Sequence, residues 1–182
     1  RDANPKAEIG VLSEWAGIQF LVDTLSTDYH AVAPDYNKFP TALCEMAEKY
    51  IKENKPSLVA ICFDNPDHVG HKEGHDTPAY YSKLEELDGY IARIVAAVKE
   101  AGMYDDTIFI ITSDHGGIKK GHGGKTMAEM QTPFIIAGKN IKKAGEFQES
   151  MVQYDVAATM AYIFGLEQPQ VWTGHAMKQV FK

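Results

Sequence analysis

The sequence has little cysteine, no long apolar run and no excess of positive charge. Only two cysteines, Cys44 and Cys62, occur among 182 residues, and neither has a metal-type spacing. A Cys44–Cys62 disulfide is possible, but nothing in the sequence requires it. No run approaches the roughly 20 apolar residues that span a bilayer, and no signal peptide is present. The sequence therefore predicts no membrane segment and leaves the redox compartment open.

The net charge of the chain bears on which kinds of molecule it could bind. The formal net charge is -7 at pH 7. This charge argues against a nucleic-acid-binding surface, because contacts to the phosphate backbone need basic residues. It does not exclude a phosphorylated small molecule, since bound metal ions change the sign of the local charge.

Length and composition fit one folded domain. A chain of 182 residues, with 45% hydrophobic and 24% charged residues, suits a single domain with a sizeable core. The first residue is Arg1 rather than Met. We interpret the sequence as a processed protein or a piece of a longer one, so the absence of a targeting signal does not locate the parent.

Short apolar runs alternate with amphipathic stretches along the chain. Strands are predicted at 8–12, 29–33, 57–63, 107–112 and 133–137, and helices at 17–25, 40–53, 78–101 and 155–164. The run 57–63 is apolar throughout, which is typical of a strand buried on both faces. Strand–helix–strand units with crossovers of this length predict parallel pairing. The expected fold is a three-layer α/β/α sandwich around a mostly parallel central sheet.

Two polar segments follow the predicted strands 57–63 and 107–112. The first, 64–77, contains DNPDHVGHKEGH, and the second, 113–132, contains SDHGGIKKGHGG. Five of the seven histidines fall within them: His68, His71, His75, His115 and His122. Since ligands bind beyond the carboxyl ends of parallel strands, we expect both segments to lie at one edge of the sheet.

The spacing of these residues indicates a metal site. Asp67 and His71 are four residues apart, so one helical turn would place both side chains on the same face. Asp114 and His115 are adjacent, and His122 follows a glycine-rich stretch that can fold back toward either group. Imidazole and carboxylate together favour zinc and similar divalent metals. A solvated loop is the plainer interpretation for an isolated histidine, and we keep it for His30 and His175.

These motifs resemble a known family. DNPDHVGHKEGH followed by SDHGG and KGHGG is similar to the carboxy-terminal half of the alkaline phosphatase superfamily, in particular its type I phosphodiesterase/nucleotide pyrophosphatase branch. The resemblance runs from about 57 to 138, and YDVAATMAYIFGL resembles a late helix of the family. It implies an alkaline phosphatase-like fold and two zinc ions. The implied ligands are Asp67, His71 and His122 for one zinc, and Asp114 and His115 for the second.

The resemblance also implies parts that the sequence does not contain. In such enzymes the second metal takes an amino-terminal Asp and a Thr or Ser nucleophile, yet the first predicted strand leads into SEWAG, which is unlike that segment. Thr41 follows Pro40 and is better interpreted as the first turn of a helix. We therefore expect no catalytic nucleophile in this chain, and we expect it to be a fragment that lacks the amino-terminal strand and nucleophile loop.

Four nearby residues receive no metal role from the resemblance. His68 and His75 flank the implied ligands and are interpreted as supporting or substrate-facing groups. Lys125 is interpreted as a solvated lysine that could reach an anionic oxygen, and Asp64 as a supporting carboxylate or loop cap.

Three interpretations of function remain open. The first is a metal-dependent hydrolase of phosphate mono- or diesters with a two-zinc site, inactive or weak as the isolated chain. The second is a sulfatase or phosphomutase of the same superfamily, although the histidine-rich set favours zinc over calcium, which prefers oxygen ligands. The third is a non-catalytic metal-binding domain. The resemblance implies a periplasmic or extracellular location.

Overall fold

The structure is a computed structural model that describes residues 3–143 and 145–182. The chain divides into two compact units. Unit 1 comprises Arg1–Tyr104 and Gly117–Met130, and unit 2 comprises Asp105–Gly116 and Gln131–Lys182. The prediction that all residues form one domain stays a prediction.

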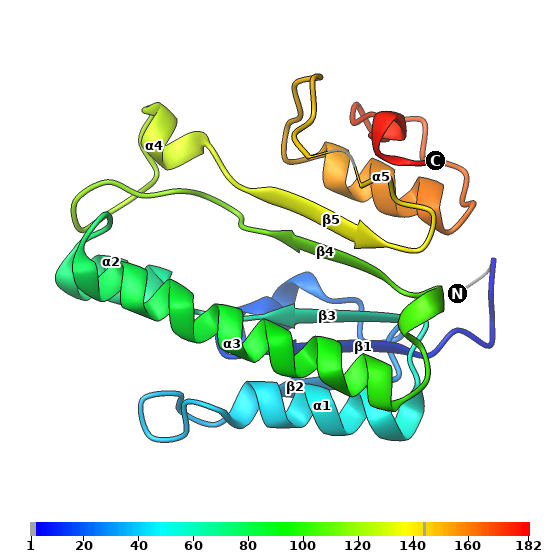
Figure 1. Cartoon of the computed structure of the whole chain (residues 1–182), viewed down its shortest axis with the longest axis horizontal. Coiled ribbons are helices and arrows are strands. Elements are labelled where there is room, and N and C mark those ends of the chain that lie inside the picture. Colours follow the sequence, from blue (N-terminus) through cyan, green and yellow to red (C-terminus); the bar gives the residue numbers. More distant parts are fainter. Residues whose placement is uncertain (1–2, 144) are drawn as a thin grey trace. The chain divides into compact units, whose positions relative to one another are not determined.

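Unit 1 contains a three-stranded parallel sheet (Figure 1). Its strands are β1 (Ile9–Ser13), β2 (Tyr29–Val32) and β3 (Leu58–Cys62), in the order β2-β1-β3. Gly10 is opposite Tyr29 on one side of β1, and Ile9 is opposite Leu58 on the other. The predicted strands and their parallel pairing are confirmed for these three segments.

Two long helices of unit 1 pack together over one face of this sheet (Figure 1). They are α1 (Ala42–Asn54) and α3 (Pro78–Glu100). The core between helices and sheet includes Leu12, Leu43 and Ala47. Because the apolar stripe of each helix needs a surface to bury against, this arrangement accounts for the amphipathic pattern of both segments.

The prediction that residues 57–63 are buried on both faces is wrong. In β3 only partial burial is found, and Ala60 is exposed. Val59 and Ile61 pack into the core under the helices, whereas Ala60 projects to the opposite face of the sheet. The two helices of unit 1 therefore account for the burial of one face of β3.

The predicted helix at 17–25 is only a short 3-10 helix, Ala16–Leu21, named η1. Phe20 and Leu21 are both at least 80% exposed. This segment buries no residue, and a helix without a packed face gains little stability. That explains why the regular helix does not extend further.

Helix α3 begins and ends as the sequence predicts. The Thr77 hydroxyl oxygen accepts a hydrogen bond from the Tyr80 amide at 3.3 Å, and Pro78 occupies the first turn. Gly102 follows the helix with φ +72°. Along this helix Leu87 and Val98 are buried, although Leu84 is 40% exposed.

The polar segment 64–77 is not irregular throughout, because it contains helix α2 (Asp67–Glu73). Pro66 precedes the helix and Gly74, with φ +108°, ends it. Only Gly70 is buried among its residues. A short polar helix lacks the periodic apolar stripe by which sequence patterns reveal helices.

Unit 2 contains an antiparallel strand pair and a further helix. Strands β4 (Ile108–Thr112) and β5 (Phe134–Gly138) pair with Ile110 opposite Ile136. Helix α5 (Asp155–Ile163) and the 3-10 segment η3 (Lys178–Val180) complete the unit, and a further 3-10 turn, η2 (Tyr104–Asp106), precedes β4. The predicted parallel pairing of 57–63 with 107–112 concerns strands of different units and stays a prediction.

Two composition-based expectations can be compared with the structure. Cys44 and Cys62 form no disulfide. Within residues 3–143 and 145–182, no helix combines the length and the apolar character needed to cross a membrane.

Candidate metal centre

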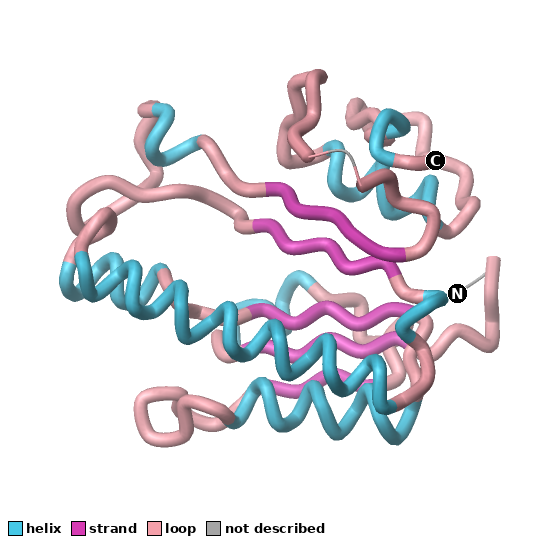
Figure 2. Tube along the Cα trace, in the orientation of Figure 1, coloured by secondary structure: helices cyan, strands magenta, loops and turns pink. Residues whose placement is uncertain are grey.

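Helix α2 brings the first two predicted ligands together. It follows the carboxyl end of β3 (Figure 2) and begins at Asp67. The helical spacing places His71 Nε2 3.2 Å from Asp67 Oδ2. Both side chains are partly exposed, with 48% of His71 and 34% of Asp67 accessible. The spacing argument from the sequence is confirmed at this helix.

A tight turn in the second polar segment positions His122. Ile118 and Gly121 exchange backbone hydrogen bonds of 2.9 and 3.1 Å, so residues 118–121 form a closed turn. Lys119 at its corner has φ +53°, the left-handed region. The Lys120 carbonyl accepts a hydrogen bond of 3.0 Å from His71 Nδ1. Since a carbonyl cannot donate, Nδ1 must carry the hydrogen, and neutral His71 keeps its lone pair on Nε2.

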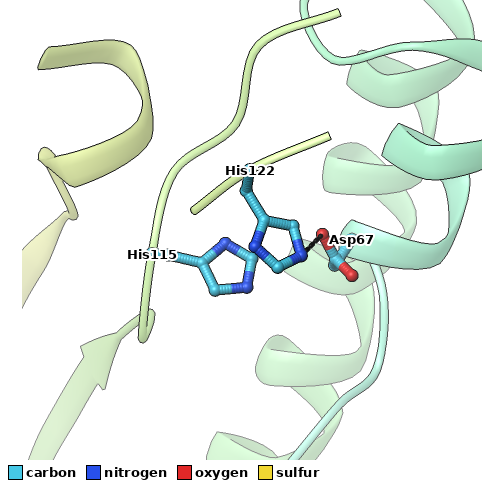
Figure 3. Close-up of side chains that lie close together, drawn as sticks. All are labelled: Asp67, His115 and His122. Atoms are coloured by element: carbon cyan, nitrogen blue, oxygen red, sulfur yellow. Dashed lines mark ion pairs between the residues drawn. The ribbon is translucent and has the colours of Figure 1, made fainter. Parts of the chain in front are cut away.

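Asp67, His71 and His122 form a compact set, which we call the first ligand set. His71 Nε2 lies 3.1 Å from His122 Nε2, and His122 Nε2 lies 3.7 Å from Asp67 Oδ1. Figure 3 draws the Asp67–His122 pair with a dashed line, together with His115, which belongs to unit 2. Atoms bound about 2.0–2.1 Å from a tetrahedral zinc lie about 3.3 Å apart, which these distances bracket.

The first ligand set also contains polar atoms that a bound cation would stabilise. Asp67 Oδ1 is buried and has no hydrogen-bond partner among the described residues. A buried carboxylate oxygen without a partner is costly. The Nε2 atoms of His71 and His122 lie 3.1 Å apart, a contact that either an N–H···N hydrogen bond or a cation bound by both lone pairs satisfies. The donor set and its geometry therefore fit a divalent metal.

The neighbouring histidines occupy different surroundings. His75 is 8% exposed, and its Nε2 lies 3.6 Å from Asp67 Oδ1. Its ring contacts Tyr80, whose pKa is raised by burial and, to a smaller extent, by the charge of Asp67. His68 turns away to make an edge contact with Tyr36.

A cavity of about 320 Å³ lies in unit 1 on the His68 side of α2. Glu14 and Tyr36 are among the residues that line it. Burial raises the pKa of Glu14. Asp64 accepts a hydrogen bond of 2.5 Å from the Tyr36 hydroxyl. Asp64 therefore supports the Tyr36 wall of this cavity, in agreement with a supporting rather than ligating role.

The second predicted pair, Asp114 and His115, follows β4 in unit 2. His115 Nε2 lies 3.7 Å from Asp114 Oδ2, and the His115 amide donates to Asp114 Oδ1 at 3.1 Å. The His115 ring donates from Nδ1 to the Gly116 carbonyl at 2.8 Å. The Asp114 side chain is 86% exposed. These two residues thus come together through local contacts, as adjacent residues in a turn.

Sequence reasoning missed a pair that orders the chain just after His122. Thr126 donates from its hydroxyl to Glu129 Oε2 at 2.6 Å, and the Gly124 amide donates to Glu129 Oε1 at 2.9 Å. The Thr126 hydrogen bond, followed by that of Gly124, lowers the pKa of Glu129. Thr126 immediately precedes the short helix α4 (Met127–Met130), and its amide also donates to Glu129 Oε2 at 3.4 Å. The T-x-x-E pattern of a capping box could have revealed this contact.

Two minor sequence interpretations agree with the structure. The Thr41 hydroxyl precedes α1 and donates to Glu45 at 2.7 Å, which is a helix-start contact. Lys125 is exposed. Neither residue lies among the contacts of the first ligand set described above.

Comparisons with known proteins place these features in a family. Residues 11–153 match the family described as type I phosphodiesterase/nucleotide pyrophosphatase. A 2,3-bisphosphoglycerate-independent phosphoglycerate mutase of Vibrio vulnificus is 31% identical over 175 residues, 92% of this chain and 32% of its own length. The human GPI ethanolamine phosphate transferase 2 catalytic subunit is 28% identical over 142 residues, 75% of this chain and 14% of its own length.

A solved structure supports the fold. A 2-O GAG sulfatase superposes with a TM-score of 0.73 at 15% identity, covering 92% of this chain and 52% of its own. The expected alkaline phosphatase-like α/β fold is thereby confirmed. The chain spans 14% to 32% of the length of the two relatives above. With more than three quarters of its residues within the matched segment, the chain belongs to the type I phosphodiesterase/nucleotide pyrophosphatase family of the alkaline phosphatase superfamily.

Proposed function

We propose that this chain carries the metal-binding part of a metal-dependent phosphate-ester hydrolase. In this proposal Asp67, His71 and His122 hold one zinc, and Asp114 and His115 contribute to a second. The observation that supports it most is the meeting of the first ligand set, whose nitrogen and carboxylate oxygen atoms lie 3.1 to 3.7 Å apart, with Asp67 Oδ1 buried.

Zinc ions at these positions would polarise a phosphoryl oxygen and lower the pKa of a nucleophile. The protein's own contribution is orientation. His71 is held by its Nδ1 hydrogen bond to the Lys120 carbonyl, so its Nε2 points toward Asp67 and His122. Such outer hydrogen bonds fix the tautomer and the ring plane of a ligating histidine. The nucleophile, a Thr or Ser in this proposal, is not assigned to any residue of this chain.

The choice of reaction class has separate support. Phosphodiesterase, mutase and transferase are the activities in the names of the family and of the relatives, and all of them handle phosphoesters. Mixed histidine and carboxylate donors favour zinc over calcium, which prefers oxygen ligands. This donor set argues against a calcium-dependent sulfatase, even though the fold is shared with a 2-O GAG sulfatase.

A second candidate is phosphoryl transfer to an alcohol rather than to water. The similarity to a phosphoglycerate mutase extends over 92% of this chain, which favours this candidate. Both reactions would use the same metal ligands, so the first experiment concerns metal binding and the second concerns the acceptor.

The metal test compares zinc affinity in matched histidine variants. We expect the chain to bind one zinc tightly, measured by competition titration with a chelator dye. His71→Ala or His122→Ala should weaken this site more than about 100-fold, beyond the usual effect of changing an outer residue. His68→Ala, which removes a neighbouring histidine of α2, is the control. Equal affinity of the His71, His122 and unaltered proteins would exclude this ligand assignment.

The reaction test uses the longer protein that includes this chain, if the chain is a part of one. Nitrophenyl phosphate, bis-nitrophenyl phosphate and nitrophenyl sulfate are offered with zinc, with and without glycerol. Release of inorganic phosphate supports the hydrolase, and ³¹P signals of glycerol phosphate support the transferase. Turnover of the sulfate ester alone would overturn both. Zinc binding without any turnover would instead favour a non-catalytic domain.

A further inference from the structure

His75 is the most buried histidine in the part of the molecule around the first ligand set. It lies between α2 and α3 and has 8% of its surface exposed. The family resemblance gives it no metal role. Its ring nevertheless lies next to Asp67, with Nε2 3.6 Å from Oδ1, and next to the His71 ring at 6.3 Å between centroids.

The Lys119 carbonyl accepts two hydrogen bonds from this one residue. The His75 amide donates at 2.6 Å, and the His75 ring donates from Nδ1 at 3.0 Å. A carbonyl can only accept, so Nδ1 carries the hydrogen. Two bonds from one residue fix both the position and the direction of this carbonyl.

The Lys119 carbonyl belongs to the 118–121 turn that precedes His122. The next carbonyl, of Lys120, accepts from His71 Nδ1 at 3.0 Å, and the Lys120 ammonium donates to the Lys72 carbonyl at 2.7 Å. All four hydrogen bonds connect α2 and its exit to the corner of one turn. The turn that leads to His122 is therefore fastened to the helix that carries Asp67 and His71.

Two glycines make room for the His75 ring. A Cβ atom built on Gly70 of α2 would lie 2.4 Å from His75 Nε2, and one on Gly117 would lie 2.2 Å from the same ring. Contacts shorter than about 3 Å cannot be accommodated without movement. The ring thus fills a slot between α2 and the segment that enters the turn, and any larger residue at either glycine would displace it.

We propose that His75 is a positioning residue that sets the register of His122 against Asp67 and His71 through the Lys119 carbonyl. This role rests on the proposed function, because it assumes that the first ligand set binds metal. His75 acts through the turn, and its Nδ1 hydrogen bond is the group that matters. This role requires the space that Gly70 and Gly117 leave for the His75 ring, and it requires the four hydrogen bonds between the 118–121 turn and the α2 region.

The test uses substitutions of His75 that each retain a hydrogen-bond donor near only one of the two ring nitrogens. Asn places an amide donor near the position of Nδ1, whereas Gln places its amide near Nε2. We expect His75→Ala to raise the zinc dissociation constant about 10- to 100-fold while one site per chain remains. His75→Asn should recover most of that affinity and His75→Gln should recover little. His68→Ala, which removes a histidine of the adjacent helix α2, serves as the control.

Two readouts distinguish positioning from general stability. Cobalt(II) absorption reports the ligand geometry, and we expect the His75→Ala spectrum to change while His75→Asn resembles the unaltered protein. Circular dichroism melting identifies variants that fail to fold, and the Asn variant keeps the proposal testable if the Ala variant unfolds. Rescue by Gln instead of Asn, or an unchanged affinity and spectrum in His75→Ala, would overturn the role of the Lys119 carbonyl.

The outcomes separate this inference from the proposed function. If the unaltered chain does not bind zinc, the ligand assignment fails. If the unaltered chain and His75→Ala bind zinc equally well, the ligand assignment stands and the positioning role fails. In the metal-free protein, amide exchange at His75 should accelerate when Gly117→Ala displaces the ring, which tests the fastening of the turn without any metal.

Discussion

The two candidate ligand groups are built in different ways. In unit 1, the first ligand set joins residues about 50 positions apart, His71 and His122 being separated by 51. In unit 2, Asp114 and His115 are sequence neighbours whose described hydrogen bonds reach Ser113 and Gly116. Asp114 is 86% exposed, whereas Asp67 is 34% exposed.

This difference indicates how much of each group is preorganised by the chain. Long-range hydrogen bonds from His71 and His75 to the 118–121 turn hold the first ligand set before any metal arrives. A preorganised set loses less conformational entropy on binding. In unit 2, His115 is half-buried, whereas the Asp114 carboxylate is 86% exposed and therefore less constrained. The first ligand set should therefore bind metal more tightly, and the following predictions concern that contrast.

The largest effect is expected from removing one carboxylate of each group. Asp67→Asn should weaken binding of the first zinc more than about 100-fold, because it removes the charge between three histidines. Asp114→Asn should weaken the same zinc by less than about 10-fold. Competition titration of both variants measures the ratio. Similar losses in the two variants would show that the contrast between the groups is false.

A smaller effect is expected from Gly70→Ala. Alanine normally favours a helix over glycine by about 1 kcal/mol. Here the added Cβ would meet the His75 ring at 2.4 Å, so we expect a loss of about 1–3 kcal/mol in unfolding free energy. Zinc affinity should fall about 10-fold with the displaced ring. Denaturant titration gives the sign, and Gly89→Ala on α3, where a Cβ meets nothing within 4 Å, is the matched control.

Glu129→Gln should have a still smaller effect on zinc affinity, since it loosens only the segment after His122. The Thr126 hydrogen bond lowers the pKa of Glu129 from its usual 4.5. A lowered pKa means that the carboxylate stabilises this segment above pH 4.5 and that the contribution is lost as the pH falls through the lowered value. Amide exchange at Gly124 should be faster in Glu129→Gln at neutral pH and should match the unaltered protein in acid. Glu149→Gln, an exposed glutamate, should change nothing.

The smallest effect on zinc is expected from Glu48→Gln, because Glu48 lies on α1 and none of its described hydrogen bonds reaches either ligand group. Arg93 donates to both carboxylate oxygens of Glu48, at 2.7 and 3.0 Å, and lowers the pKa of Glu48. Solvent screens this partly exposed pair, so its loss should cost about 0.5–1 kcal/mol at neutral pH. The cost should vanish as the pH falls through the lowered pKa. If Glu48→Gln changed the zinc affinity, the affinity would depend on the overall stability of the fold and not on the contacts near the ligands.

The sequence predicted the elements whose residues carry their own signal. The apolar runs of β1, β3 and β4 and the Thr77-Pro78 start of α3 appear within two residues of their predicted positions. The four-residue spacing of Asp67 and His71 also gave the correct contact. Each of these features depends on side-chain type and local spacing, which a single sequence displays directly.

The parts that escaped prediction depend on backbone groups or on packing. Helix α2 is polar on nearly every side, so no apolar period marks it. His71 donates to the carbonyl oxygen of Lys120 and His75 to that of Lys119, and every residue has a carbonyl. Glu129 is the exception, because its T-x-x-E pattern with Thr126 is visible in the sequence.

The 118–121 turn places an unusual constraint on related sequences. Lys119 contributes its carbonyl to His75, so its side chain is free to vary wherever the replacement tolerates φ near +53°. The number of residues is not free to vary, because one insertion would rotate both carbonyls away from α2 and shift His122 along the chain. Relatives that keep this arrangement should therefore conserve the number of residues between Gly117 and His122 more strictly than the identities of those residues.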